Sequence, residues 1–293
     1  MKKILYATDF SKNAEKAFDF ALNIAEKHHA DLIMLHVFDT PPVWGHPYIT
    51  DPAEMAIAAI KSYESKLQEF FEQFESGMQP AFIAVENNST VKGILSMIKE
   101  HKPDLVVTGT KGKSKLKEIF VGSTTKALVK ESPAPVLAIP ENSKYKDFNK
   151  VLYASDFQEV DLLALEQLIE LVKPYKPEIR IIHVSTESEY KGHEKMEWFK
   201  DLVKDNISYK NISFELLLSD TIFERVNTYQ NQYDYDMMVM LEKERHGIVK
   251  KLFNEDLVWK MEFHTRIPLL SYNEHYIHAK DDQDIKKSDK VDH

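Results

Sequence analysis

The chain has 293 residues, contains no cysteine and carries a formal net charge of −9 at pH 7. This length suits one large domain or two ordinary ones. The lack of cysteine excludes a disulfide framework and a cysteine nucleophile, and the negative charge argues against nucleic-acid binding by the whole molecule. The apolar run at the N-terminus ends at Asp9, too early for a secretory signal, and no stretch approaches the ~18 apolar residues of a membrane helix. We therefore expect a cytoplasmic protein without membrane or nucleic-acid partners.

Predicted strands and helices alternate along the first part of the chain. Helical spacing predicts a helix with Ser11 as its N-cap, a long helix that begins at Asp51-Pro52, and a third helix over 89–101. Near-continuous apolar strands between such helices are typical of an α/β fold, with a parallel sheet covered on both faces. The apolar runs predict five strands, at 2–8, 31–37, 80–86, 104–109 and 134–140.

The second part of the chain repeats the first. KILYATDF at 3–10 is matched by KVLYASDF at 150–157, and DLIMLHV at 31–37 is matched by EIRIIHV at 178–184, both at an offset of 147 residues. PAPVLAIPE returns more weakly as RIPLLSYNE. Two tandem copies of one domain are the simplest interpretation. We expect domains at 1–142 and 149–276, joined through the polar stretch 141–149, and a disordered charged tail at 278–293.

The stretch GTKGKSKLKEIFVGST, at 109–124, holds three of the chain's eight glycines and four lysines. Its spacing argues against a Walker A loop, because two residues rather than four separate Gly109 from Gly112. It also argues against the G-x-x-G loop of a KH RNA-binding domain, because that loop joins two helices and this stretch follows a strand. The dinucleotide fingerprint G-x-G-x-x-G is absent from the sequence.

The spacing that the stretch does fit is G-x2-G-x9-G-[ST], with Gly109, Gly112, Gly122 and Ser123 at the fixed positions. Together with KILYATDFS, LHV and PAPVLAIP in this order, it resembles the universal stress protein family, in particular its ATP-binding branch. The resemblance extends over nearly the whole chain as two tandem domains. It implies two open, twisted five-stranded parallel sheets of strand order 3-2-1-4-5 with helices on both faces, as in adenine nucleotide alpha hydrolase-like proteins.

The expected nucleotide site lies where the first and fourth strands end, at the reversal of strand order. Glycines in the loop let backbone amides approach an anion closely, and the helix that begins after Gly122 has a dipole that favours phosphate. The family comparison implies that Asp9 accepts a hydrogen bond from the nucleotide, although Asp9 also suits a helix cap beside Ser11. The resemblance implies ATP, or else AMP or ADP, with Mg²⁺. The expected ligands are Ala7, Thr8, Asp9 and Val37 around the adenine and ribose and, in the loop, Gly109, Thr110, Lys111, Gly112, Gly122, Ser123 and Thr124.

The second copy retains the aspartate of the site, as Asp156, but not the loop glycines. Leu241 or Glu242 falls opposite Gly109, depending on one residue of alignment slack. Carboxylates at 255 and 256 replace the glycine and serine that open the helix in the first copy, and carboxylates repel phosphate. The sequence therefore predicts one competent site per chain, in the first copy.

Other conspicuous residues are not assigned to a site. His36 and His183 occupy matching strand ends in different copies, which favours a local hydrogen bond over a shared metal. The phenylalanines of the long helix, Phe70, Phe71 and Phe74, are expected in the core or at an interface. Neither a metal ligand nor a catalytic residue is predicted.

The resulting hypothesis is a stress-response or regulatory protein that depends on an adenine nucleotide bound in the first copy. The resemblance implies an intramolecular pseudo-dimer through the last strands of the two copies, and it leaves a homodimer open. A slow ATP-hydrolysing enzyme and a nucleotide-free interaction scaffold remain alternatives. Against the enzyme, no residue is placed to activate water, and the S-G-G-x-D-S loop of the related pyrophosphatases is missing.

Overall fold

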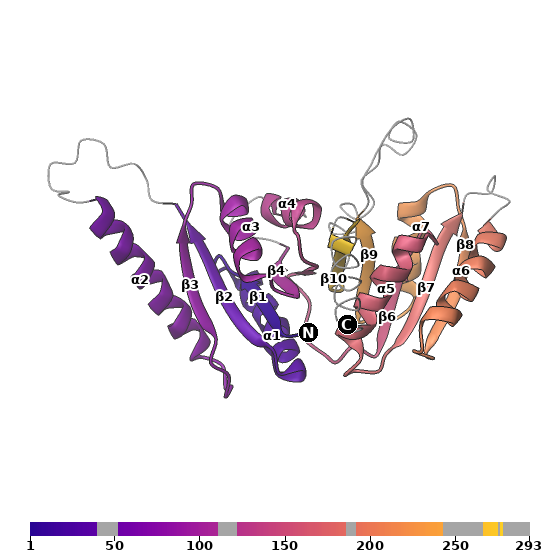
Figure 1. The fold of residues 1–293 in the computed structure, drawn as a ribbon, viewed down its shortest axis with the longest axis horizontal. Helices are drawn as coiled ribbons and strands as arrows, with labels where there is room; N and C mark the ends of the chain where they lie inside the picture. Colours follow the sequence, from indigo (N-terminus) through magenta and orange to yellow (C-terminus); the bar gives the residue numbers. More distant parts are fainter. Residues whose placement is uncertain (40–51, 111–121, 186–191, 243–265, 275, 278–293) are drawn as a thin grey trace, which may run out of the picture.

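The computed structural model describes residues 1–39, 52–110, 122–185, 192–242, 266–274, 276 and 277 (Figure 1). Asp51 and the charged tail predicted at 278–293 lie outside these residues. The first half of the chain, residues 1–142, contains β1 (Lys3–Ala7), α1 (Lys12–His28), β2 (Asp31–Phe38), α2 (Pro52–Phe71), β3 (Ala81–Glu86), α3 (Thr90–His101), β4 (Leu105–Gly109), α4 (Ser123–Glu131) and β5 (Val136–Ile139). The second half, residues 149–276, contains β6 (Lys150–Ala154), α5 (Glu159–Val172), β7 (Glu178–Ser185), α6 (Gly192–Asn206), β8 (Ile212–Leu218), α7 (Ile222–Gln232), β9 (Met237–Glu242) and β10 (Leu269–Asn273).

The ten strands form one sheet in the order β3-β2-β1-β4-β5-β10-β9-β6-β7-β8. Within each half the order is the predicted 3-2-1-4-5, and the neighbouring strands are parallel. The two predicted five-stranded sheets are continuous with each other, because β5 and β10 pair antiparallel with Leu137 opposite Leu270. All four residues of β5 are buried, and pairing with β10 keeps this apolar edge out of water.

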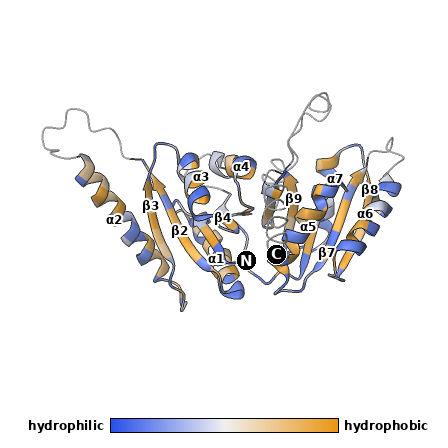
Figure 2. Cartoon of the chain, viewed as in Figure 1, coloured by the Kyte–Doolittle hydropathy of each residue, from blue (hydrophilic) through white to orange (hydrophobic). Residues whose placement is uncertain are grey.

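Helices cover both faces of the sheet, and the strands between them are predominantly hydrophobic (Figure 2). On one face α1, α2, α5 and α6 pack onto alternate strand residues such as Tyr6 and Tyr153, in a core that continues across both halves. The predicted core phenylalanines belong to this layer, because Phe18 of α1 lies 5.2 Å from Phe70 and 4.6 Å from Phe74 between ring centroids. The other face carries α3, α4 and α7 over residues such as Leu5 and Leu152. None of the helices in the described ranges combines the length and apolar character that crossing a bilayer requires.

An aspartate fixes the start of the central strands in each half. Asp104 Oδ2 accepts hydrogen bonds from the backbone N–H groups of Lys2 and Lys3 at 2.6 and 3.1 Å. In the second half, Asp236 Oδ2 accepts those of Asn149 and Lys150 at 2.6 and 2.8 Å. Each aspartate directly precedes the fourth strand of its half, and its carboxylate therefore ties the start of that strand to the start of the first strand.

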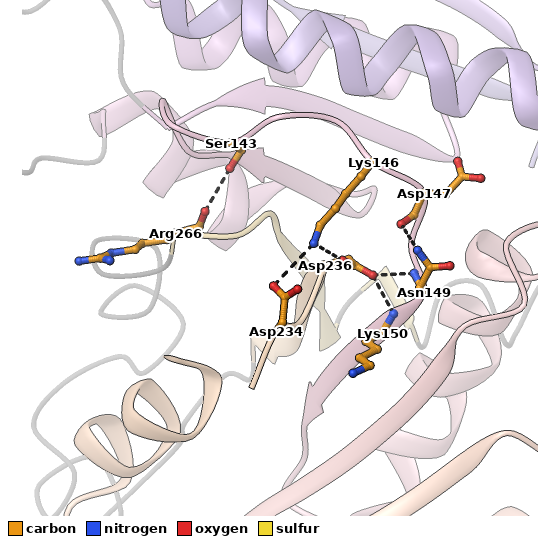
Figure 3. Close-up of polar contacts among 8 residues, drawn as sticks. All are labelled: Ser143, Lys146, Asp147, Asn149, Lys150, Asp234, Asp236 and Arg266. Atoms are coloured by element: carbon orange, nitrogen blue, oxygen red, sulfur yellow. Dashed lines mark hydrogen bonds and ion pairs between the residues drawn. The ribbon is translucent and has the colours of Figure 1, made fainter. Parts of the chain in front are cut away.

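The segment that joins the halves is fastened to the second half (Figure 3). Lys146 Nζ lies 2.6 Å from Asp236 Oδ1 and 3.7 Å from Asp234 Oδ1. Ser143 Oγ donates to the Arg266 carbonyl oxygen at 3.3 Å, just before β10. These contacts hold the connection beside the strand that pairs with β5.

The end of α1 also reaches the second half. His28, the last residue of α1, has its Nε2 2.7 Å from the Leu171 carbonyl oxygen at the end of α5. Nε2 therefore donates, because a carbonyl oxygen can only accept. Burial lowers the pKa of His28, and the Leu171 hydrogen bond opposes this shift. Beside it, Lys27 Nζ forms an ion pair with Asp147 at 3.2 Å.

Candidate functional site

The predicted site lies at the carboxyl ends of β1 and β4. These strands are neighbours, with Ala7 paired with Thr108, so that Asp9 and Gly109 both follow strand ends at one edge of the sheet. β1 has β2 on its other side, and the chain crosses from one side to the other at this point. This is the position at which open α/β sheets bind ligands.

A tight turn after β1 holds Asp9. Phe10 has a left-handed backbone with φ of 57°, which is rare for a residue other than glycine. The Phe10 N–H donates to Thr8 Oγ1 at 3.0 Å, and the Ser11 N–H donates to Asp9 Oδ1 at 2.9 Å. Ser11 Oγ in turn accepts the Ala14 N–H and caps α1, as predicted. The Asp9 carboxylate is thus oriented by the turn, in agreement with the capping interpretation.

Two residues predicted around the adenine and ribose are buried in the sheet core. Ala7 and Val37 both belong to the layer under α3 and α4. Gly93 of α3 gives Val37 its space, because a Cβ built on Gly93 would lie 2.6 Å from Val37 Cγ1. Thr8 is buried as well, and its N–H donates to the Leu35 carbonyl oxygen at 2.9 Å. These residues are therefore part of the packed core at the strand ends.

The two ends of the glycine-rich loop are brought together. The Thr110 N–H donates to Ile139 of β5 at 3.0 Å, and the Gly122 N–H donates to the Thr110 carbonyl oxygen at 2.6 Å. Thr125 Oγ1 donates to the Gly109 carbonyl oxygen at 3.0 Å. Lys111 and Gly112 lie outside the described residues. The sequence analysis did not predict a role for Thr125. A hydroxyl residue in the first turn of the helix that follows the loop could have indicated this contact.

The helix after the loop starts without a side-chain cap. Gly122 is the N-cap of α4 and has no side chain to offer, so the first-turn amides receive no side-chain acceptor from it. Ser123 is exposed and Thr124 half-buried at this end. An uncapped helix N-terminus offers donors and a positive dipole end, which together suit an anion.

The histidines at the strand ends make the predicted local hydrogen bonds. His36 Nδ1 lies 2.8 Å from the Thr8 carbonyl oxygen, and His183 Nδ1 lies 2.8 Å from that of Ser155. Each ring therefore ties the second strand of its half to the turn after the first strand. Among the described residues, no three histidines or carboxylates gather as metal ligands would.

The second half has the same frame but a different end to its fourth strand. Ala154 pairs with Met240 as Ala7 pairs with Thr108, so the residue opposite Gly109 is Leu241, not Glu242. Leu241 is buried in the core. Asp156 follows β6 and is exposed, and the carboxylates at 255 and 256 lie outside the described residues.

Known proteins match this chain in sequence and in fold. The sequence profile of the universal stress protein family matches residues 1–140. A putative universal stress protein of Staphylococcus saprophyticus is 24% identical over 171 residues, which make up 54% of this chain and 94% of the relative. A universal stress protein of Methanocaldococcus jannaschii is 29% identical over 150 residues, 49% of this chain and 84% of the relative.

Solved structures extend the likeness in fold to both halves. The crystal structure of a universal stress protein from Archaeoglobus fulgidus covers 93% of this chain and 98% of its own, with a TM-score of 0.64 and 19% identity. At that identity the likeness concerns the fold alone. Taken with the family profile, the relatives and the strand order, the chain belongs through residues 1–140 to the universal stress protein family.

Proposed function

We propose that the first half binds one adenine nucleotide, ATP or AMP, and that the protein acts as a nucleotide-dependent regulator in a cytoplasmic stress response. The observation that carries the proposal is the closure of the loop ends. Thr110 and Gly122 are joined by a 2.6 Å hydrogen bond, and this places the uncapped start of α4 at the end of β4. Family membership of residues 1–140 supports the same ligand class.

The residues present fit a phosphate group. The start of α4 supplies backbone donors, and Ser123 and Thr124 supply hydroxyls there. Asp9 follows the end of β1, the strand next to β4, and its carboxylate is suited to accept a hydrogen bond from a ribose hydroxyl. Mg²⁺ with ATP would add positive charge beside the phosphates. No group among these residues is assigned to hydrolysis.

The proposal is tested by identifying the nucleotide that the purified protein releases on denaturation, followed by titration of the emptied protein with MgATP, ADP and AMP. We expect about one adenine nucleotide per chain, because the sequence predicts one competent site, in the first copy. Gly122→Trp fills the start of α4 and should abolish binding. Gly77→Trp is the matched control, because Gly77 has no atom within 4 Å of a built Cβ and lies far from the site in the sequence.

Each outcome separates the alternatives. Binding with many turnovers would indicate an ATP-hydrolysing enzyme, whereas binding without turnover supports a nucleotide-dependent regulator. The absence of released nucleotide, together with no heat of binding for any of the three nucleotides, would overturn the proposal and leave an interaction scaffold.

We further propose that the two halves form an internal pseudo-dimer, supported by the antiparallel pairing of Leu137 with Leu270. The mass in solution, measured by light scattering, tests whether whole chains also associate. A monomer would agree with the use of the β5 edge inside the chain, and a concentration-independent dimer would call for a second interface.

A further inference from the structure

We propose that Asn13 is a positioning residue for the nucleotide loop, acting through Gly109; this inference rests on the proposed function. Asn13 is the second residue of α1 and is 4% exposed. A Cβ built on Gly109 would lie 2.6 Å from Asn13 Nδ2 and 3.1 Å from Asn13 Cγ. The Asn13 side chain therefore occupies the space that any side chain at position 109 would need.

Gly109 is required for this space and not for an unusual backbone. Its φ lies outside the left-handed region, so a residue with a side chain could adopt the same conformation. A side chain at position 109 would first meet the amide of Asn13, which would have to move, and then the Asn13 backbone carbonyl carbon, 3.2 Å from the built Cβ. Glycine at this position thus has a reason within the protein, apart from any contact with phosphate.

The second half shows the alternative solution. Tyr6 and Tyr153 match at the offset of 147 residues, so Asn13 corresponds to Val160, and the strand pairing makes Gly109 correspond to Leu241. Val160 and Leu241 are each 8% exposed and belong to one core cluster. An asparagine with a glycine in one half is therefore replaced by a valine with a leucine in the other. The half with the small residue on the strand is the half with the glycine-rich loop.

Asn13 can influence a ligand through Gly109 because Gly109 also contacts α4, the helix that follows the loop. The Gly109 carbonyl oxygen accepts from Thr125 Oγ1 at 3.0 Å, and the next residue, Thr110, accepts the Gly122 N–H. A displacement of Gly109 would consequently displace the start of α4. Asn13 is not placed to bind phosphate itself, since it is buried beneath the strand end.

A double-mutant cycle tests the inference, with Gly109→Ala, Asn13→Ala and the double variant. For each protein we would measure the dissociation constant for MgATP by calorimetry and the melting temperature without nucleotide. Overpacking at position 109 should weaken binding about tenfold or more. Asn13→Ala should recover most of that loss in the double variant, because it removes the two closest atoms. Val160→Ala is the matched control in the second half and should leave the dissociation constant unchanged.

The outcomes distinguish this inference from the proposed function. If the wild type binds MgATP and the two substitutions are additive in binding, Gly109 serves the phosphate alone and the positioning role of Asn13 is wrong. Recovery of the melting temperature without recovery of binding also overturns it, because the contact would then be purely structural. If Gly109→Ala fails to fold, recovery of both folding and binding in the double variant supports the role. If the wild type binds no nucleotide, the proposed function itself has failed.

Discussion

The two halves of the chain agree in the turn after the first strand and differ at the end of the fourth strand, where we propose that the nucleotide binds. Both have a left-handed phenylalanine after the first strand, Phe10 and Phe157, with φ of 57° and 53°. In both, a histidine Nδ1 lies 2.8 Å from the carbonyl oxygen of the residue two positions before that phenylalanine. At the end of the fourth strand, by contrast, Gly109 of the first half is replaced by Leu241. The turn after the first strand is therefore an element of the fold common to both halves, and by itself it does not predict a nucleotide site.

A second difference lies on the face of the sheet covered by α3 and α7. Ile33 and Ile83 of the first half correspond by register to Arg180 and Glu215, whose Nη1 and Oε2 atoms are 3.2 Å apart. Tyr229 of α7 donates to the same Glu215 oxygen at 2.6 Å. Two apolar positions of the first half are thus occupied by a hydrogen-bonded charged pair in the second, while the strands have the same register. The comparison shows that this face tolerates a polar pair at two positions while neighbouring positions such as Leu5 and Leu152 stay apolar.

The largest expected effect concerns the aspartates that fix the central strands. Asp236→Ala should reduce the free energy of unfolding by about 3 kcal/mol, because it leaves two part-buried backbone donors without their acceptor and removes the nearer of the two carboxylate partners of Lys146. Asp104→Ala should cost about 2 kcal/mol, since its contacts lie nearer the surface. Urea unfolding of both variants measures the difference. Equal losses of unfolding free energy would mean that Asp104 and Asp236 stabilise their halves equally in spite of their different burial.

A smaller difference in unfolding free energy is expected between variants of Tyr6 and Tyr153, the buried tyrosines of the two first strands. Tyr153 donates to the Asp161 carboxylate at 3.0 Å, whereas Tyr6 donates to the Ala14 carbonyl oxygen at 2.7 Å. Hydrogen bonds to charged groups contribute more, so Tyr153→Phe should cost about 1.5–3 kcal/mol and Tyr6→Phe about 0.5–1.5 kcal/mol. Thermal unfolding of the two variants side by side checks this order, and a larger loss for Tyr6→Phe would contradict it.

The hydroxyls of Thr8 and Ser155, in the turns after the two first strands, test whether only the first half binds the nucleotide. Thr8 Oγ1 and Ser155 Oγ accept the N–H groups of Phe10 and Phe157 at 3.0 and 2.9 Å. Thr8→Ala and Ser155→Ala should each cost about 1 kcal/mol of stability. Only Thr8→Ala should weaken MgATP binding, and Thr8→Ser is its control because it keeps the acceptor. Weakened binding in Ser155→Ala would mean that the second half also takes part in the site.

The smallest effect is a dependence on pH at the contact between the halves. Burial lowers the pKa of His28, so the unfolded chain takes up a proton more readily and stability falls as the pH drops through about 6.5. His28→Gln keeps a donor for the Leu171 carbonyl oxygen without the titration. The melting temperature of the wild type should therefore fall more steeply than that of His28→Gln between pH 7.5 and 5.5. Parallel curves would assign the dependence to other groups.

The sequence was sufficient for those features that depend on local pattern. Apolar runs placed β1 and β4, and a serine before a helical period placed the cap at Ser11. Features that depend on contacts between distant segments were missed. Nothing in the periodicity of α1 indicates that Asn13 fills the space beside Gly109, because that contact depends on how the helix crosses the strand. The aspartates before the fourth strands did leave a signal, since Asp104 and Asp236 both directly precede an apolar run.

The pairing of β5 with β10 has a consequence for how the chain is made. Three of the four buried residues of β5 pair on their second side with β10, a strand near the end of the described sequence, with Val136 opposite Ser271. During synthesis the first half leaves the ribosome with this apolar edge open, and it stays open until β10 has emerged. An open apolar edge is where strands of different chains join. A truncated or stalled chain should therefore aggregate through β5, whereas the complete chain carries the strand that protects it.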